Sequence, residues 1–298
     1  QGDYNYLHDM GPRQWEGTIQ CGLEQGKKFG IMGSTDQHAG YPGSYGDGRI
    51  GILAESLTRD KIWDAMKNRH VCCATGDKIN IDFRLNDAFP GDVVRGNSRR
   101  IYLNVEGGSC IDYIDIVKNR RCIARLSGPL LPEMPEGDMV RCKVKIEFGW
   151  NREEQYVHWQ GKLSISKGTI NAVEPCFRGA AFTSPQPGEP EFETKVNRIV
   201  SVTDKDTELD MYSSKNPNTT TPAMQAVILD VTMPKDGMIT AEFNGKKLEH
   251  SLSELLEGSR SHFMIGWLSE AILFNRAMPE SCFMVEHYME DTEPERDT

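Results

Sequence analysis

The stretch VRCKVKIEF, residues 140–148, alternates apolar and charged residues over its whole length. The apolar positions are Val140, Cys142, Val144, Ile146 and Phe148, and the charged ones are Arg141, Lys143, Lys145 and Glu147. Successive side chains of a β-strand point to opposite faces, so this spacing predicts a strand with one buried face. Such strands belong to antiparallel sheets, in which only one face needs to be covered.

The same period-two pattern recurs at residues 79–85. Further candidate strands, separated by clusters of Gly, Pro, Asn and Asp, are residues 100–105, 113–117, 162–166, 226–233 and 238–243. Many short strands at this spacing predict a β-sandwich-like region over residues 78–290. We expect the apolar residues of 79–85 to share one core with those of 140–148. Residues 251–258 predict a short helix, and residues 291–298 a frayed acidic tail.

Residues 1–77 show a different pattern, which predicts an α/β domain. A helix is expected over 13–26, because Trp15, Ile19 and Leu23 are four residues apart and Gly26 is placed to end it. A second helix is expected after Thr58, ending near residues 68–70, with Leu57 and Ile62 spaced as a hydrophobic staple. Between them, the apolar run 29–33 is typical of a parallel strand covered on both faces.

An Asp-x-His pair, Asp36 and His38, directly follows that apolar run in a glycine-rich segment. A carboxylate and an imidazole two residues apart can be aimed at one point, and they are ligands suited to Zn, Mn or Fe. Two alternatives stay open. Asp36 caps a turn while His38 is an ordinary loop histidine, or the pair serves in acid–base catalysis without a metal.

Residues 22–92 carry four landmarks: G-S-T-D-Q-H (33–38), P-G-S-Y-G (42–46), A-E-S-L-T-R (54–59) and A-T-G-D-K-I (74–79). With them, the chain resembles the C-terminal part of a bacterial and archaeal family that is classed as a domain of unknown function. That family is assigned to the PHP (polymerase and histidinol phosphatase) superfamily of metal-dependent phosphoesterases. Residues 80–280 resemble its trailing β-rich region.

The resemblance implies a distorted (β/α)7 barrel holding two or three divalent metals. The superfamily's ligands are an H-x-H near the start, His and acidic residues midway, and a final D-x-H, which Asp36 and His38 match. The chain has seven histidines and no H-x-H. We therefore expect residues 1–77 to form only the last β/α units, followed by the sandwich-like region. The remaining ligands would come from a missing N-terminal barrel half or from a second polypeptide, and a barrel that has lost its metals is the alternative.

Three further residues are candidates for the same site. His8 is a third candidate metal ligand, although a lone histidine is more often a turn or surface residue. Tyr45 and Arg49 lie on the glycine-rich segment after the metal pair, where an arginine can clamp an anionic substrate. Trp150 and Trp159 fit either a sugar-binding platform or strand packing.

Composition limits the partners. The net charge of -10 and the lack of a Lys/Arg run argue against nucleic acid, and no apolar stretch reaches the length of a membrane span. Eight scattered cysteines without C-x-x-C spacing favour reduced thiols and a cytoplasmic setting, with export of a longer parent protein as the alternative.

Two hypotheses for the function follow. The first is part of a hydrolase that uses a metal-activated water on a small-molecule ester, a phosphate ester by the resemblance. The second is a non-catalytic module in which the β-rich region binds a carbohydrate or a partner subunit.

Overall fold

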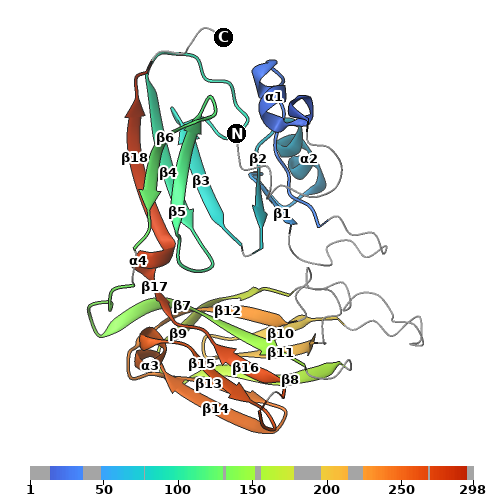
Figure 1. The fold of residues 1–298 in the computed structure, drawn as a ribbon, viewed down its shortest axis with the longest axis vertical. Helices are drawn as coiled ribbons and strands as arrows, with labels where there is room; N and C mark the ends of the chain where they lie inside the picture. The colour runs from blue at the N-terminus through green and yellow to red at the C-terminus, as the bar shows by residue number, and fades with distance from the viewer. Residues whose placement is uncertain are drawn as a thin grey trace, which may run out of the picture.

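Antiparallel sheets make up most of the computed structural model, which describes residues 14–35, 48–76, 78–129, 132–151, 156–177, 196–213, 224–267 and 269–293. Strands account for 51% of the described residues and helices for 12%, and every strand pair described is antiparallel. Figure 1 shows two tiers. One is a large β-sandwich, and the other combines two small sheets with a helix-bearing hairpin.

The sandwich consists of a six-stranded and a five-stranded sheet. The first has the order β15 (Arg260–Phe263), β16 (Ala271–Phe274), β7 (Met139–Gly149), β12 (Gln225–Pro234) and β9 (Thr169–Pro175), and β17 (Met278–Pro279) also pairs with β7. The second has the order β10 (Arg198–Val202), β11 (Asp206–Ser213), β8 (Val157–Ile165), β13 (Met238–Phe243) and β14 (Lys246–Ser251). Helix α3 (Leu252–Glu257) follows β14.

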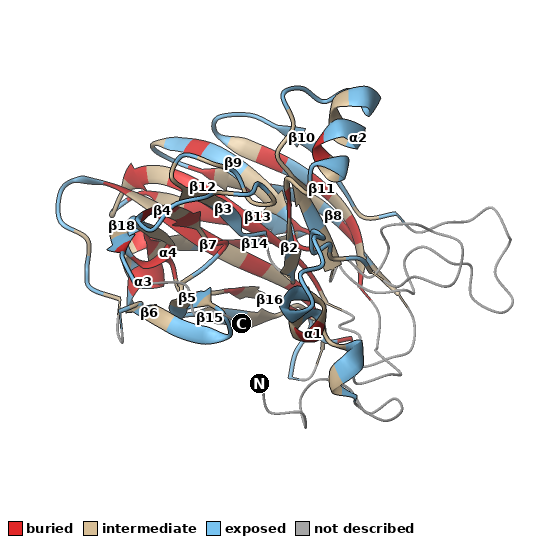
Figure 2. Cartoon of the chain, turned by 90° about the horizontal axis from the view of Figure 1, so that it is seen from above, coloured by how far each residue is buried: buried red, intermediate tan, exposed pale blue. Residues whose placement is uncertain are grey.

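The core lies between these two sheets. Phe148 on β7 is fully buried, with its ring centroid 5.5 Å from that of Trp159 and 4.8 Å from that of Phe243. Both neighbours come from the opposite sheet. The Trp159 indole N–H donates to the Ser213 hydroxyl at 2.8 Å, so its polar atom is satisfied inside the core. Figure 2 shows the buried residues following the sandwich strands, whereas α2 is mostly exposed.

The other tier contains the remaining sheets. One has the order β18 (Met284–Asp291), β4 (Arg99–Glu106), β3 (Asn80–Leu85), and another pairs β5 (Tyr113–Lys118) with β6 (Arg121–Ser127). Helix α4 (Glu280–Phe283) leads from the sandwich into β18. The Asp291 carboxylate at the end of β18 is buried and accepts from Arg99 Nε and Lys118 Nζ, each at 2.7 Å.

The hairpin of β1 (Gly48–Ile52) and β2 (Val71–Thr75) completes this tier. Helix α2 (Arg59–Lys67) connects the two strands, and the 3-10 helix η2 (Trp15–Gly17) and helix α1 (Ile19–Glu24) precede them. The prediction of β/α barrel units in residues 1–77 is therefore wrong. The two strands that flank α2 run antiparallel, whereas a β/α barrel requires parallel ones.

The expected parallel strand at 29–33 is also wrong, since residues 27–35 form no strand. Ile31 and Met32 are 43% and 55% exposed, so the run is not covered on both faces by the described residues. A short apolar run does not by itself specify its backbone hydrogen-bonding partners. The segment instead passes over the hairpin, with Gly30 close to the Val71 side chain.

The helix predictions are confirmed in part. The helix after Thr58 exists as α2, but Leu57 is 93% exposed, so the expected hydrophobic staple is wrong. The expected helix over 13–26 is broken at Thr18, whose extended backbone and hydroxyl cap the start of α1. The helix at 251–258 is confirmed as α3, with Ser251 and Glu254 forming a capping box.

The strands predicted within residues 78–290 are confirmed at every segment named, as β3, β4, β5, β7, β8, β12 and β13. The shared core of 79–85 with 140–148 is wrong. Val144 and Ile146 are fully buried in the sandwich, whereas Ile79 and Ile81 are 42% and 38% exposed beside a different sheet. Alternation identifies the apolar face of a strand but not the sheet against which that face packs.

Substitution of Phe148 tests the assignment of the core. Phe148→Ala should lower the free energy of unfolding by about 3–5 kcal/mol, because it leaves a cavity between the sheets. The matched control is Trp267→Ala, at a residue 81% exposed, which should cost less than about 0.5 kcal/mol. Chemical denaturation measures both, and equal effects would contradict the assignment.

Candidate functional site

A polar cavity of about 450 Å³ lies where the two tiers meet. Its walls come from β7, β9 and β12 of the sandwich and from β1, β3 and β4 of the other tier. The charged residues in the walls are Arg49, Lys78, Glu106, Arg141, Lys143, Glu174 and Asp230. Both signs of charge are therefore present in one partly enclosed space.

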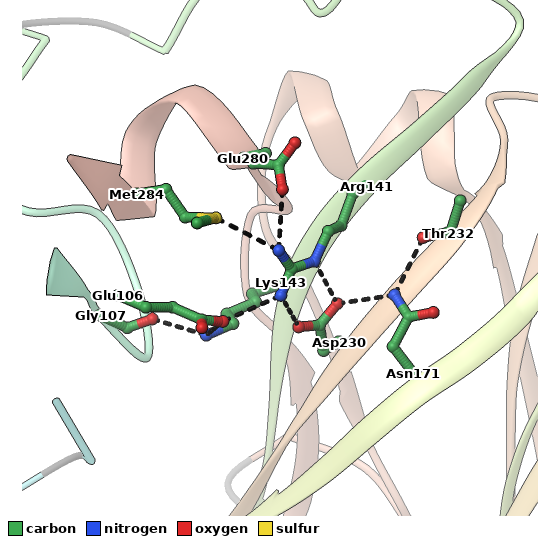
Figure 3. A network of polar contacts seen from close by, with 9 residues as sticks. All are labelled: Glu106, Gly107, Arg141, Lys143, Asn171, Asp230, Thr232, Glu280 and Met284. Carbon is green, nitrogen blue, oxygen red and sulfur yellow. Dashed lines mark hydrogen bonds and ion pairs between the residues drawn. The ribbon is translucent and has the colours of Figure 1, made fainter. Parts of the chain in front are cut away.

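Arg141 holds the centre of this junction, as Figure 3 shows. Its guanidinium binds Asp230 on β12 through two hydrogen bonds, Nε–Oδ1 at 3.1 Å and Nη2–Oδ2 at 2.6 Å. It also donates to Glu106 on β4 at 2.9 Å and to Glu280 on α4 at 2.8 Å. One side chain of the sandwich thus binds β4 of the other tier and α4, the helix that leads into that tier.

Lys143 extends the network beyond Arg141. Its ammonium lies 2.8 Å from Glu106 Oε1 and donates to the Gly107 carbonyl at 2.7 Å. Its Nζ is 4.6 Å from the centre of the Phe283 ring, which is a cation–π distance. The hydrogen bond from Lys143 lowers the pKa of Glu106 below its ordinary 4.5. The bond to Asp230 raises the pKa of Arg141, so these groups stay charged at neutral pH.

Arg49 occupies a different position at the edge of the cavity. Its Nη1 is 3.6 Å from Glu174 Oε1, and its Nη2 donates to the Pro175 carbonyl at 3.3 Å. Glu174 also accepts from the Lys78 backbone N–H at 2.8 Å. The contacts of Arg49 are long compared with those of Arg141, so the Arg49 guanidinium can turn to an incoming anion more easily than that of Arg141.

The predicted metal ligands Asp36, His38 and His8 and the predicted substrate residue Tyr45 lie outside the described residues. The residues that bracket the Asp-x-His segment are placed, however. Gly48 approaches Ser34 so closely that a Cβ at position 48 would lie 1.9 Å from the Ser34 carbonyl oxygen. Arg49 follows directly and lies close to Gly33, so this predicted substrate residue lies both beside the residues that bracket the segment and at the cavity.

No group of three His, Cys, Asp or Glu side chains suited to a metal ion occurs in the described part of the chain. Of the two tryptophans considered for sugar binding, Trp159 is buried in the core and Trp150 is 42% exposed just after β7. Within the same described ranges, no helix has the length and apolar content to cross a bilayer.

The junction network was missed at the sequence level. Arg141 and Lys143 were assigned to the polar face of a strand, which is ordinarily exposed to water, yet Lys143 is only 8% exposed. The sequence did contain one signal of this network: Asp230 interrupts an otherwise apolar run on β12. A lone acid inside a buried strand requires a cationic partner. Comparisons with family models, curated proteins and solved structures gave no match.

Removal of Asp230 tests the junction. Asp230→Ala should lower the free energy of unfolding by about 3 kcal/mol, because it leaves the Arg141 charge without its bidentate partner. The control is Asp236→Ala, whose ion pair with Lys167 is exposed and should contribute less than about 1 kcal/mol. Chemical denaturation measures the free energy of unfolding of both variants. A small loss of stability for Asp230→Ala would argue against a structural role for the Arg141–Asp230 pair at the junction.

The lowered pKa of Glu106 predicts a pH dependence. A carboxyl group with a depressed pKa contributes stability that is present above its ordinary value, about 4.5, and is lost as the pH falls through the folded-state value. The difference in unfolding free energy between wild type and Glu106→Gln should therefore be largest near pH 7 and shrink toward pH 3. Glu257→Gln, at an exposed carboxylate on α3, is the control. A difference in unfolding free energy between wild type and Glu106→Gln that stays constant with pH would contradict the lowered pKa of Glu106.

Proposed function

We propose that this chain is part of a metal-dependent hydrolase that acts on a phosphate ester. Asp36 and His38 are two of its metal ligands, and Arg49 binds the anionic group of the substrate. The observation that carries the proposal is the position of Arg49, which lies beside the residues bracketing the Asp-x-His segment and at the edge of the polar cavity. Arginine matches phosphate oxygens with two parallel N–H donors.

The donor chemistry of Asp36 and His38 suits a divalent Zn, Mn or Fe ion. Two donors do not complete a site, and the described residues hold no further group of ligands. We propose that the remaining ligands lie outside the described residues, with His8 as one candidate and a missing N-terminal half or a second polypeptide as the source of the others. When bound, such a metal supplies an activated water and polarises the phosphoryl oxygen.

Exposed apolar side chains on the same tier support an additional polypeptide there. Ile19 and Leu23 on α1 and Trp63 on α2 are about half exposed, although they follow the spacing of packed helix faces. Uncovered apolar faces of this kind commonly mark an interface with another polypeptide. The phosphate ester as substrate follows from the resemblance to PHP phosphoesterases, and Tyr45 is a second candidate for contact with it.

A second function, a binding module, is favoured by one observation on the sandwich. The connection between β15 and β16 presents Ile265 and Trp267, which are 87% and 81% exposed. A tryptophan and an isoleucine at an exposed turn are suited to contact with an apolar surface of a partner subunit or with a sugar ring. In this case Asp36 and His38 would have no catalytic role.

Metal content and activity of ligand variants test the first function. The chain alone should bind metal poorly and hydrolyse nothing, and the chain joined to a polypeptide that supplies the remaining ligands should do both. In the joined form, Asp36→Asn and His38→Ala should each reduce metal occupancy and lower the rate at least about a hundredfold. The measurements are elemental analysis and a general phosphoesterase screen. Full metal content and unchanged activity in both variants would reject the site.

Arg49→Ala separates substrate binding from metal binding in the same experiment. It should raise the KM for a phosphate ester while leaving metal occupancy unchanged, since Arg49 binds the anion and not the metal. The matched control is Arg125→Ala, at an exposed arginine paired with Asp115 on the β5–β6 hairpin. A joined protein that is metal-free and inactive would favour the binding module instead.

A further inference from the structure

Two histidines connect the two sheets of the sandwich at one edge. His250 lies on β14, the outer strand of the five-stranded sheet, and His262 lies on β15, the outer strand of the six-stranded sheet. Their Nε2 atoms are 2.7 Å apart, which is a hydrogen-bonding distance. The contact therefore joins two strands that share no backbone ladder.

The surroundings hold both rings in place. The ring centroids are 4.9 Å apart, and each ring meets the buried Phe274 edge-on, at 5.1 Å for His250 and 6.3 Å for His262. Lys246 on β14 donates to the Phe263 carbonyl on β15, next to the pair. This second bond also crosses between the sheets, so the edge is closed at two adjacent points.

Few charged groups face the pair. The Glu254 carboxylate on α3 is 3.7 Å from His250 Nδ1, and Arg260 on β15 and Lys246 on β14 add positive charge. Burial lowers the pKa of both histidines, and Arg260 adds to this for His250, as His250 and Lys246 do for His262. Only Glu254 opposes the shift, at His250. One carboxylate therefore faces two imidazoles and two permanent cations.

The number of protons on the pair decides whether the contact survives. A bond between two facing imidazole nitrogens needs one N–H donor and one lone pair. A neutral pair satisfies this, and so does a pair with a single imidazolium. When both rings are imidazolium, two N–H groups and two positive charges face each other at the same distance, and no acceptor remains.

We propose that His250 and His262 form a pH-sensitive latch between the two sheets. The latch is closed while the pair carries no more than one extra proton, and uptake of the second proton opens it. Opening frees β14 from β15, and with β15 the turn that presents Ile265 and Trp267. This inference concerns the sandwich alone and is independent of the proposed hydrolase.

The direction of the pH dependence follows from the lowered pKa values. Histidines with depressed folded-state values contribute stability that is present above the ordinary value of about 6.5 and is lost as the pH falls through the folded-state values. The latch is therefore closed at neutral pH and opens on acidification below about pH 6.5. The two protonation steps belong to the pair and not to either histidine alone.

Amide hydrogen exchange of the full chain between pH 5 and 8 tests the latch, after correction for intrinsic exchange rates. In the wild type, the opening constant of β14 and β15 amides should rise below about pH 6.5, by up to about tenfold per pH unit for each proton taken up. Amides of the central strand β12 should show no such rise. His262→Gln and His250→Gln keep a hydrogen-bonding side chain and leave one titrating imidazole, so each should reduce the steepest slope to that of a single proton.

The control is His287→Gln on β18, in the other tier, which should behave as the wild type. A flat wild-type profile would overturn the latch, and the wild-type protein alone decides this if a variant fails to fold. A slope in either glutamine variant as steep as that of the wild type, or a slope that His287→Gln reduces, would also overturn it. So would an equal rise in β12, which would show global acid unfolding instead of local opening.

Discussion

Strand β7 packs against a different partner on each of its faces, and both tiers depend on this. Its apolar face, with Val144, Ile146 and Phe148, fills the core between the two sheets. Its charged face, with Arg141 and Lys143, binds the ends of β4 and α4. A bidentate arginine fixes orientation as well as distance, because both hydrogen bonds must be made in one plane. The charged side chains of β7 thus join the small sheets to the sandwich through their contacts with Glu106, Gly107 and Glu280.

The positions of the strands could be predicted from the sequence, but their pairing into sheets could not. Alternation predicted β3 and β7, because the burial of one face of a strand leaves a pattern in the sequence of that strand alone. The apolar run of β12 and the other short apolar segments were sufficient to predict the remaining strands. Pairing is not local. The hydrogen-bonding partners of β1 and β2 are set by which backbone groups meet, and an apolar run such as 29–33 is compatible with a strand or with an extended segment that passes over one.

For the candidate site too, single residues could be predicted from the sequence but their spatial arrangement could not. Arg49 was selected from its place after the Asp-x-His pair, and the structure puts it at a cavity that the sequence did not reveal. The cavity depends on Glu174 and Asp230, which lie more than 120 residues farther along the chain. Contacts across such separations leave no spacing pattern, although Asp230, a charge within a buried strand, was a usable local signal. The paired histidines on β14 and β15 were equally inaccessible, since each looks like an isolated histidine in the sequence.

The return of β18 to β4 has a consequence for the order of folding. β3 and β4 are made early, but the strand that completes their sheet, and the buried Asp291 that neutralises Arg99 and Lys118, come after the whole sandwich. Contacts between segments so distant in sequence carry a high loop-closure cost and form late. During synthesis the apolar faces of Leu103 and Val105 remain without their third strand while the sandwich is being made. The tier that is nearer the start of the chain is thus the last to be finished.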